Sequence, residues 1–299
     1  MNAAITVLDG GMGGEIQARI PAAAHGLWSA TALVEMPELV VELHREFIDA
    51  GADVITTNTY ATVPSYLGKG GMADRFEELT ALAARLARKA ASRGGGQVRV
   101  AGSLPPLDES YRFDLVHEDD DAAPIYRRMV RAMAADVDLF LCETMSCAHE
   151  ARCAAAEALA HGGGKPVYVA WTLGEEPGTG LRSGETIAEA FAALDGLDVA
   201  AYLFNCTHPE AIEVGLVELK ALTDKPLGCY PNRLNRVPTG WTLDNERVIG
   251  LRDDLPVELY VESIQRSIDC GATIVGGCCG IGPRYIQAMS QTVRGTAAV

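Results

Sequence analysis

Residues 37–57 read PELVVELHREFIDAGADVITT and join one helix pattern to one strand pattern. In the first part, apolar side chains recur every three to four positions and acidic ones occupy the opposite face, which predicts an amphipathic helix over Pro37–Ala50. After Gly51, the β-branched run Val54–Thr57 predicts a short buried strand. This stretch therefore predicts one helix followed by one strand across a tight turn.

The same unit recurs along the whole chain. Further apolar runs are separated by stretches long enough for one helix and two loops, and Ala73–Ser92 and Pro256–Asp269 have clear helical patterns. The predicted strands are Ile5–Leu8, Val54–Thr57, Val98–Gly102, Leu139–Cys142, Val167–Trp171, Ala201–Phe204, Pro226–Tyr230 and Thr273–Val275. Eight such units in 299 residues predict an α/β fold, the (β/α)8 TIM barrel, formed as a single domain over residues 1–299.

The alternative fold for this alternation is a doubly wound open sheet. That fold binds nucleotides through a G-x-G-x-x-G turn after a strand, with an acidic residue about 20 positions later. The glycine-rich stretch Asp9–Gly14 does not have this spacing, and the chain contains no G-x-x-x-x-G-K-[ST] motif. We therefore favour the barrel.

Composition excludes several classes of protein. The 25 Lys and Arg against 40 Asp and Glu give a formal net charge of −15, which opposes nucleic-acid binding, because phosphate neutralisation needs clustered cations. No transmembrane helix or membrane-surface segment is expected, since the chain has neither an apolar run of about 18 residues nor a cationic amphipathic stretch. The N-terminus lacks the basic region of a signal peptide, so a cytoplasmic protein is expected.

Polar and thiol residues follow the predicted strands at the end where a barrel carries its active site. Asp9 follows the first strand, Glu143 the fourth, Cys206 the sixth, and Cys278 and Cys279 come shortly after the eighth. Such residues are not needed by an apolar core. They are candidates for one site at the barrel mouth.

Three of these residues are thiols, which suggests a metal. Adjacent strand residues face opposite ways, so Cys278 and Cys279 can reach one ion only if the backbone leaves strand geometry, which the flanking glycines permit. With Cys206 they would offer zinc three thiolates and leave a fourth position open, as in catalytic sites. The alternative is that the thiols are small buried fillers. That role is expected for the remaining cysteines, Cys142, Cys147, Cys153, Cys229 and Cys270.

The two carboxylates, Asp9 and Glu143, suit an ammonium group, although they could instead cap the following loops or pair with Lys or Arg. Beside a zinc thiolate site they suggest a substrate with an amino group and a thiol. The histidines form no H-x-H or H-E-x-x-H, and no G-x-S-x-G occurs, so a histidine-ligated zinc hydrolase or a serine hydrolase is not expected. His208, two residues from Cys206, is expected on the surface at a helix start, with a position behind the metal ligands as the alternative. The irregular segment Pro231–Leu255 is expected to cover the barrel mouth.

These residues resemble the homocysteine S-methyltransferase family, the zinc-dependent methyltransferases that make methionine. The stretches that carry the resemblance span nearly the whole chain and are Asp9–Gly13, Leu27–Ala30, Gly51–Tyr60, Gly102–Pro106, Glu143-Thr144, Asn205-Cys206 and Gly276–Gly280. The resemblance implies Zn²⁺ on Cys206, Cys278 and Cys279, with the homocysteine thiolate at the open position. It implies that the substrate-binding residues are Asp9 and Glu143, which hold the amino group, together with Thr56, Thr57, Asn58, Tyr60 and Asn205.

The resemblance also implies the reaction, methyl transfer to homocysteine with S-methylmethionine or S-adenosylmethionine as the expected donor. The alternative donors are betaine or another onium compound, and the alternative acceptors are another small thiol or a selenol. The departure of Gly14 and residues 233–238 from the family pattern favours keeping these alternatives. The cobalamin route is not expected, because it needs further domains of a size that 299 residues do not accommodate. Aromatic faces bind onium cations. The candidates for this role are Trp28, Tyr60, Tyr111 and Trp241, with simple packing as the alternative.

Two hypotheses belong to other functional classes. One is a non-catalytic zinc-thiolate sensor of redox state or electrophiles. The other is an amino-acid carrier, against which the three thiols and two carboxylates argue. The expected partners are small molecules, with no nucleic acid and no membrane, and no pattern in the sequence predicts an oligomeric state.

Overall fold

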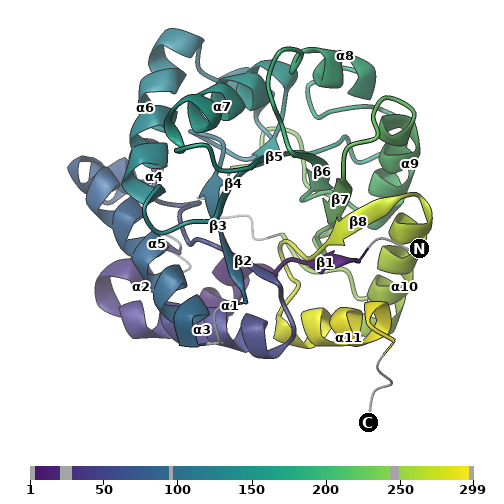
Figure 1. Ribbon diagram of the computed structural model, residues 1–299, viewed down its shortest axis with the longest axis horizontal. Coiled ribbons are helices and arrows are strands. Elements are labelled where there is room, and N and C mark those ends of the chain that lie inside the picture. Colours follow the sequence, from purple (N-terminus) through teal and green to yellow (C-terminus); the bar gives the residue numbers. More distant parts are fainter. Residues whose placement is uncertain (1–3, 21–28, 94–96, 243–248, 296–299) are drawn as a thin grey trace.

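The computed structural model describes residues 4–20, 29–93, 97–242 and 249–295. Within these ranges one parallel sheet of eight strands has the order β1-β8-β7-β6-β5-β4-β3-β2. A bridge between Leu8 and Val54 joins the first strand to the second, so the strands form a closed ring (Figure 1). The strands are β1 (Thr6–Val7), β2 (Val54–Thr56), β3 (Arg99–Leu104), β4 (Leu139–Met145), β5 (Val167–Trp171), β6 (Ala201–Asn205), β7 (Leu227–Tyr230) and β8 (Ala272–Val275). The predicted (β/α)8 barrel is confirmed.

Helices surround the ring of strands on its outside (Figure 1). The α-helices are α1 (Met12–Arg19), α2 (Ala30–Glu35), α3 (Pro37–Asp49), α4 (Pro64–Lys69), α5 (Phe76–Arg93), α6 (Asp119–Met133), α7 (Ala148–His161), α8 (Ile187–Ala192), α9 (Pro209–Lys220), α10 (Val257–Asp269) and α11 (Pro283–Val293), and two 3-10 turns are η2 (Ala73–Arg75) and η3 (Phe113–Leu115). In the described part of the chain, no helix is both long enough and apolar enough to cross a membrane.

The sheet is buried on both of its faces. Leu8, Val54, Leu141 and Leu203 belong to a compact cluster that fills the inside of the barrel, and a larger cluster lies between the strands and the helices. Parallel strands covered on both sides need nearly continuous apolar sequence. This explains why the strands could be recognised as unbroken apolar runs.

The fourth strand differs from its prediction. The sequence suggested that it ends at Cys142, but β4 continues to Met145. Its register with β5 shifts between Cys142 and Met145, and Thr144 has a φ of 61°. Glu143 therefore lies within an irregular part of the strand and not behind its end. A change of register of this kind re-aims side chains, as β-bulges near active sites do.

Candidate active site

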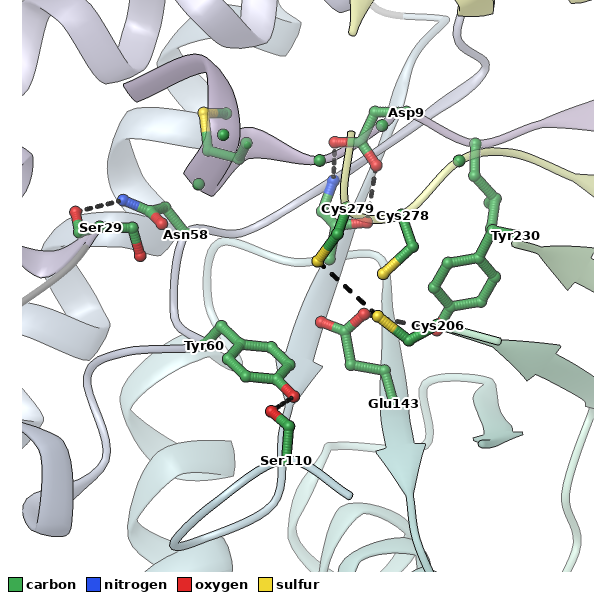
Figure 2. Close-up of a pocket in the computed structure, with 18 of the residues that line it drawn as sticks. Asp9, Ser29, Asn58, Tyr60, Ser110, Glu143, Cys206, Tyr230, Cys278 and Cys279 are labelled. Carbon is green, nitrogen blue, oxygen red and sulfur yellow. Dashed lines mark hydrogen bonds between the residues drawn. The ribbon is translucent and has the colours of Figure 1, made fainter. Parts of the chain in front are cut away.

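A pocket opens where the carboxyl ends of the strands meet, and it encloses about 910 Å³ with its mouth included (Figure 2). Nearly all of the residues expected from the sequence line it. These are Asp9, Thr56, Thr57, Asn58, Tyr60, Glu143, Cys206, Cys278 and Cys279. The other residues that line it include Ser29, Tyr111, Tyr230 and Trp241. The rule that barrels carry their site at this face therefore applies to this chain.

The three cysteines meet at one side of the pocket (Figure 2). Their sulfur atoms all lie within 4.8 Å of one another, and the Sγ atoms of Cys206 and Cys279 are 3.8 Å apart. Gly277 lets the segment after β8 turn tightly on itself, because a Cβ at this position would stand 2.2 Å from a side-chain carbon of Ile281. Backbone bonds then fix the cysteines, since Cys278 N donates to Pro231 O and Cys206 N to Tyr230 O.

The sulfur spacing fits one tetrahedral metal ion. Sulfurs bound to zinc at about 2.3 Å lie about 3.8 Å from one another. Among the described residues, these cysteines are the one group of three or more possible ligands within such a distance. Hydrogen bonds from Cys278 and Cys279 lower the pKa of Cys206, while the same contacts raise the pKa values of Cys278 and Cys279. A soft cation bound to the three sulfurs would take the place of their protons.

Asp9 and Glu143 line the same pocket and are 4% and 8% exposed. Burial raises the pKa of each carboxyl to about 7. Asp9 accepts hydrogen bonds from the backbone nitrogen and hydroxyl of Thr56 at 2.7 and 2.9 Å, and Glu143 accepts from Ser103 and Tyr230. No Lys or Arg is among the described residues that line the pocket. The site therefore offers two buried carboxyl groups to a cation from outside.

Strained backbone is concentrated at this site. In the described ranges, the non-glycine residues with positive φ are Tyr111 at 67°, Thr144 at 61° and Cys206 at 52°. Such a conformation costs on the order of 1–3 kcal/mol per residue and persists only where its surroundings hold it. All three residues lie at the pocket or directly beside a residue that lines it. This concentration supports a functional site.

Asn205 holds one of these strained residues. Its side-chain oxygen accepts from Thr144 N at 2.8 Å and its amide nitrogen donates to Thr144 Oγ1 at 2.8 Å. Asn205 is fully buried and is not among the residues that line the pocket. It therefore lies behind the site, where it links β4 to β6, and not at the substrate position expected from the sequence.

Tyr230 was not identified from the sequence, and Tyr111 was a candidate only for binding the donor. Tyr230 ends β7, so the strand-end rule could have found it, and its hydroxyl lies 3.4 Å from Glu143. Tyr111 lies in a loop after β3, and its hydroxyl donates to Cys206 Sγ at 3.2 Å. No local pattern predicts that contact. Trp28, a candidate for donor binding, lies outside the described residues.

The segment after β7 forms part of the pocket wall. It lies against the rim through a bond from Arg233 N to Cys279 O at 2.9 Å, and Leu234 and Trp241 line the pocket. His208 begins α9 as expected, but its side chain is only 16% exposed and its Nε2 lies 2.8 Å from Leu234 O. The expectation of a surface histidine was therefore wrong, because His208 anchors this segment.

The other cysteines match their expected role. Cys142, Cys153 and Cys229 are buried, and burial raises their thiol pKa values. Cys147 accepts a bond from Glu150 N at the start of α7, and Cys270 ends α10. All eight thiols of the chain are free.

Comparison with known proteins agrees with this geometry. The family model for homocysteine S-methyltransferase matches residues 6–293. Homocysteine S-methyltransferase from Escherichia coli is 31% identical over 95% of this chain and 94% of its own, and homocysteine S-methyltransferase 4 from Zea mays is 29% identical over 96% and 89%. Selenocysteine Se-methyltransferase from Brassica oleracea is 27% identical over 95% and 88%.

A solved structure shares the whole fold. The metallated form of the homocysteine methyltransferase MmuM from Escherichia coli superposes with a TM-score of 0.79 at 28% identity, covering 96% of each chain. The family match extends over nearly all of the sequence, and every residue that lines the pocket lies within it. The chain belongs to the homocysteine S-methyltransferase family.

Proposed function

We propose that the protein transfers a methyl group from a small onium compound to the thiol of homocysteine and so forms methionine, with Zn²⁺ held by Cys206, Cys278 and Cys279. The observation that carries this proposal is a single pocket that contains three sulfurs at the spacing of zinc ligands and two buried carboxyl groups. No Lys or Arg is among the described residues that line this pocket. Homocysteine has a thiol for the first group and an ammonium for the second. The names of the family and of its members support the same acceptor.

Asp9 and Glu143 would hold the ammonium group of the acceptor. Both carboxyls face the pocket, and a desolvated cation is bound best by charge-assisted hydrogen bonds. The carboxylate of the acceptor would meet backbone N–H groups instead, because the pocket includes the first turn of α1, from Met12 to Gly14. The first N–H groups of a helix have no partner within the helix and favour an anion.

When bound, zinc supplies the deprotonated acceptor thiol at neutral pH. The residues of the chain then need only to orient the two substrates and exclude water, so no dedicated general base is required. A new bond forms between the acceptor sulfur and the methyl carbon, and the bond from that carbon to the onium centre breaks. The leaving group departs as a neutral thioether or amine, so the reaction removes one positive and one negative charge.

The donor would approach beside Tyr60 and Trp241, which line the pocket together with Leu234. An acidic pocket with aromatic side chains suits a sulfonium or a quaternary ammonium. We propose S-methylmethionine or S-adenosylmethionine as the donor, with betaine as the alternative. A selenol acceptor is a second candidate, because the similar proteins include a selenocysteine Se-methyltransferase.

The proposed activity occupies the whole barrel, which we treat as one homocysteine-binding domain over residues 1–299. Eight free thiols are compatible with a reducing compartment, so we propose that the enzyme acts in the cytoplasm.

The test is methionine formation by zinc-loaded protein from homocysteine, run in parallel with S-methylmethionine, S-adenosylmethionine and betaine. We expect turnover with one donor, lost on chelation and lost in Cys278→Ser. Turnover would exclude a mere sensor or carrier. No methionine from any donor, with zinc shown to be bound, would overturn the proposed reaction.

A further inference from the structure

Tyr111 contacts the proposed metal ligands through its hydroxyl. This hydroxyl donates a hydrogen bond to Cys206 Sγ at 3.2 Å. Tyr60, a second tyrosine of the same pocket, instead places its hydroxyl 2.6 Å from Ser110 Oγ. The hydroxyl of Tyr111 thus lies against a sulfur, whereas that of Tyr60 lies against the hydroxyl of a serine.

The ring of Tyr111 is held in place from its sides. The guanidinium of Arg182 lies over the ring at 4.7 Å from its centre, and the ring of Trp241 packs at 6.2 Å with a tilt of 45°. Arg182 is itself fixed, since its Nη2 bonds Glu175 Oε1 at 2.7 Å and its side chain is only 12% exposed. Glu175 also accepts from Val237 N at 3.0 Å, so the segment after β7 contributes to the same support.

Both partners of the O–H···S hydrogen bond have strained backbone. Tyr111 has a φ of 67° and Cys206 a φ of 52°. A non-glycine residue keeps such a conformation only where surrounding contacts determine it. The strain therefore indicates that the direction of each side chain matters at this contact.

The same geometry argues against Tyr111 as a docking face for the methyl donor. One face of its ring already carries a cation, the guanidinium of Arg182. The edge with the hydroxyl points at sulfur. The contacts of the ring therefore fix the position of the Tyr111 hydroxyl.

We propose that Tyr111 is a positioning residue of the metal centre, whose hydroxyl holds Cys206 Sγ in place and draws charge from it. The inference rests on the proposed function, because it takes Cys206, Cys278 and Cys279 as the metal ligands. Three thiolates on one divalent cation leave an excess negative charge, and a hydrogen bond to one sulfur disperses part of it. Groups that bond metal ligands in this way commonly set metal affinity by about tenfold to a hundredfold.

The test compares Co²⁺-loaded wild-type protein with Tyr111→Phe. Removing the hydroxyl raises the energy of the sulfur electrons, so we expect the sulfur-to-Co²⁺ charge-transfer absorption to move to longer wavelength. We expect zinc affinity, measured by competition with a chromophoric chelator, to fall by about tenfold to a hundredfold. A loss of structure alone would not move the absorption band of a bound metal in this direction.

Tyr60→Phe is the control, since it removes a hydroxyl of the same pocket that lies 2.6 Å from Ser110 Oγ, and its band should shift much less than that of Tyr111→Phe. Arg182→Met keeps the hydroxyl but loosens the ring, and we expect a smaller shift in the same direction. This variant also serves if Tyr111→Phe fails to fold, as monitored by circular dichroism. A wild-type band and wild-type zinc affinity in both Tyr111→Phe and Arg182→Met would overturn this inference and leave the proposed function intact. Absence of any thiolate band in wild-type protein would overturn the proposed metal centre as well.

Discussion

The proposed role of Glu143 depends on the surroundings of its carboxyl group. It is nearly fully buried, it accepts from Ser103 and Tyr230, and it has no cation beside it among the described residues of the pocket. Desolvation disfavours the charged carboxylate, and this is the main cause of its raised pKa. An ammonium group entering the pocket would reverse that effect, because a facing cation favours the charged form.

The first prediction concerns pH. Burial raises the pKa values of Asp9 and Glu143 to about 7, so the free enzyme below that pH has protonated, neutral carboxyls that attract an ammonium group poorly. We expect kcat/KM for homocysteine to fall as the pH drops through about 7 and to level off above it, since this ratio reports groups of the free enzyme. Steady-state rates with zinc content measured at each pH provide the check. A profile that stays flat between pH 6 and 8 would contradict the ammonium site.

The second prediction is for Glu143→Gln. Loss of the negative charge should raise KM for homocysteine by about tenfold to a hundredfold, equivalent to about 1.5–3 kcal/mol for a hydrogen bond to a charged group. Zinc content should not change. The matched control is Glu150→Gln, because Glu150 is also buried and burial raises its pKa to about 7, yet it bonds Ser146 and does not line the pocket. Equal effects of the two substitutions on KM would rule out an ammonium role for Glu143.

Single site residues could be predicted from the sequence where they come directly after a strand. Asp9, Cys206 and the vicinal cysteines were found because each comes after an apolar run that must be a strand. Tyr111 could not be assigned its contact with Cys206, since a backbone with a φ of 67° in a loop is imposed by tertiary packing. Local sequence carries no information on that packing.

Among the elements of the fold, β4 departs most from a regular strand, and its irregular end explains the position of Glu143. Thr144 comes next with positive φ, and Asn205 at the end of β6 bonds both its backbone nitrogen and its hydroxyl. Because Cys206 comes directly after Asn205, one amide side chain fixes both the carboxylate side and the thiol side of the pocket. The two strands are not adjacent in the sheet, since β5 lies between them.

The third prediction is for Asn205→Ala. The substitution removes the partner of the buried Thr144 N–H and one of the bonds of the Thr144 hydroxyl, at about 1–3 kcal/mol for a buried group left unpaired. We expect the free energy of unfolding, from urea denaturation, to fall by about 2–4 kcal/mol and kcat/KM to fall with it. Asn235→Ala is the control, because Asn235 is exposed and its side chain makes a bond of 3.4 Å to Leu251 O. A stability loss no greater than that of this control would disprove the bracing role.

The elements themselves were largely predictable. All eight strands were found in the expected places because buried parallel strands must be apolar throughout, and α3 and α10 match the predicted helices within one residue. Ala73–Ser92 divides into η2 and α5. The end of β4 was missed, because an irregularity of register arises from pairing with β5 and leaves no period in the sequence.

In the molecule as a whole, the parts that stabilise the fold are distinct from the residues of the candidate site. The two apolar clusters and the closed ring of strands hold the barrel together, whereas the sulfurs lie at the carboxyl ends of the strands (Figure 1 and Figure 2). A metal at this rim would tie β6 to the segment after β8, but it would not replace any part of the sheet. This arrangement is that expected of a catalytic site and not of a structural zinc site.

The fourth prediction is that metal removal leaves the barrel folded. Chelation should abolish activity and lower the melting temperature modestly, because a ligand that binds only the native state stabilises it by mass action. The far-UV circular dichroism should stay the same, and added Zn²⁺ should restore activity. Loss of the folded signal on chelation would mean that the metal is structural.

The most direct test of the central claim is X-ray absorption at the zinc edge, recorded before and after addition of homocysteine. We predict three sulfur neighbours at about 2.3 Å and one lighter atom in the resting protein. With homocysteine, a fourth sulfur at the same distance should replace the lighter atom. Fewer than three sulfur neighbours at rest, or a zinc environment that homocysteine does not change, would contradict the claim that this pocket holds the substrate thiol on a metal bound by Cys206, Cys278 and Cys279.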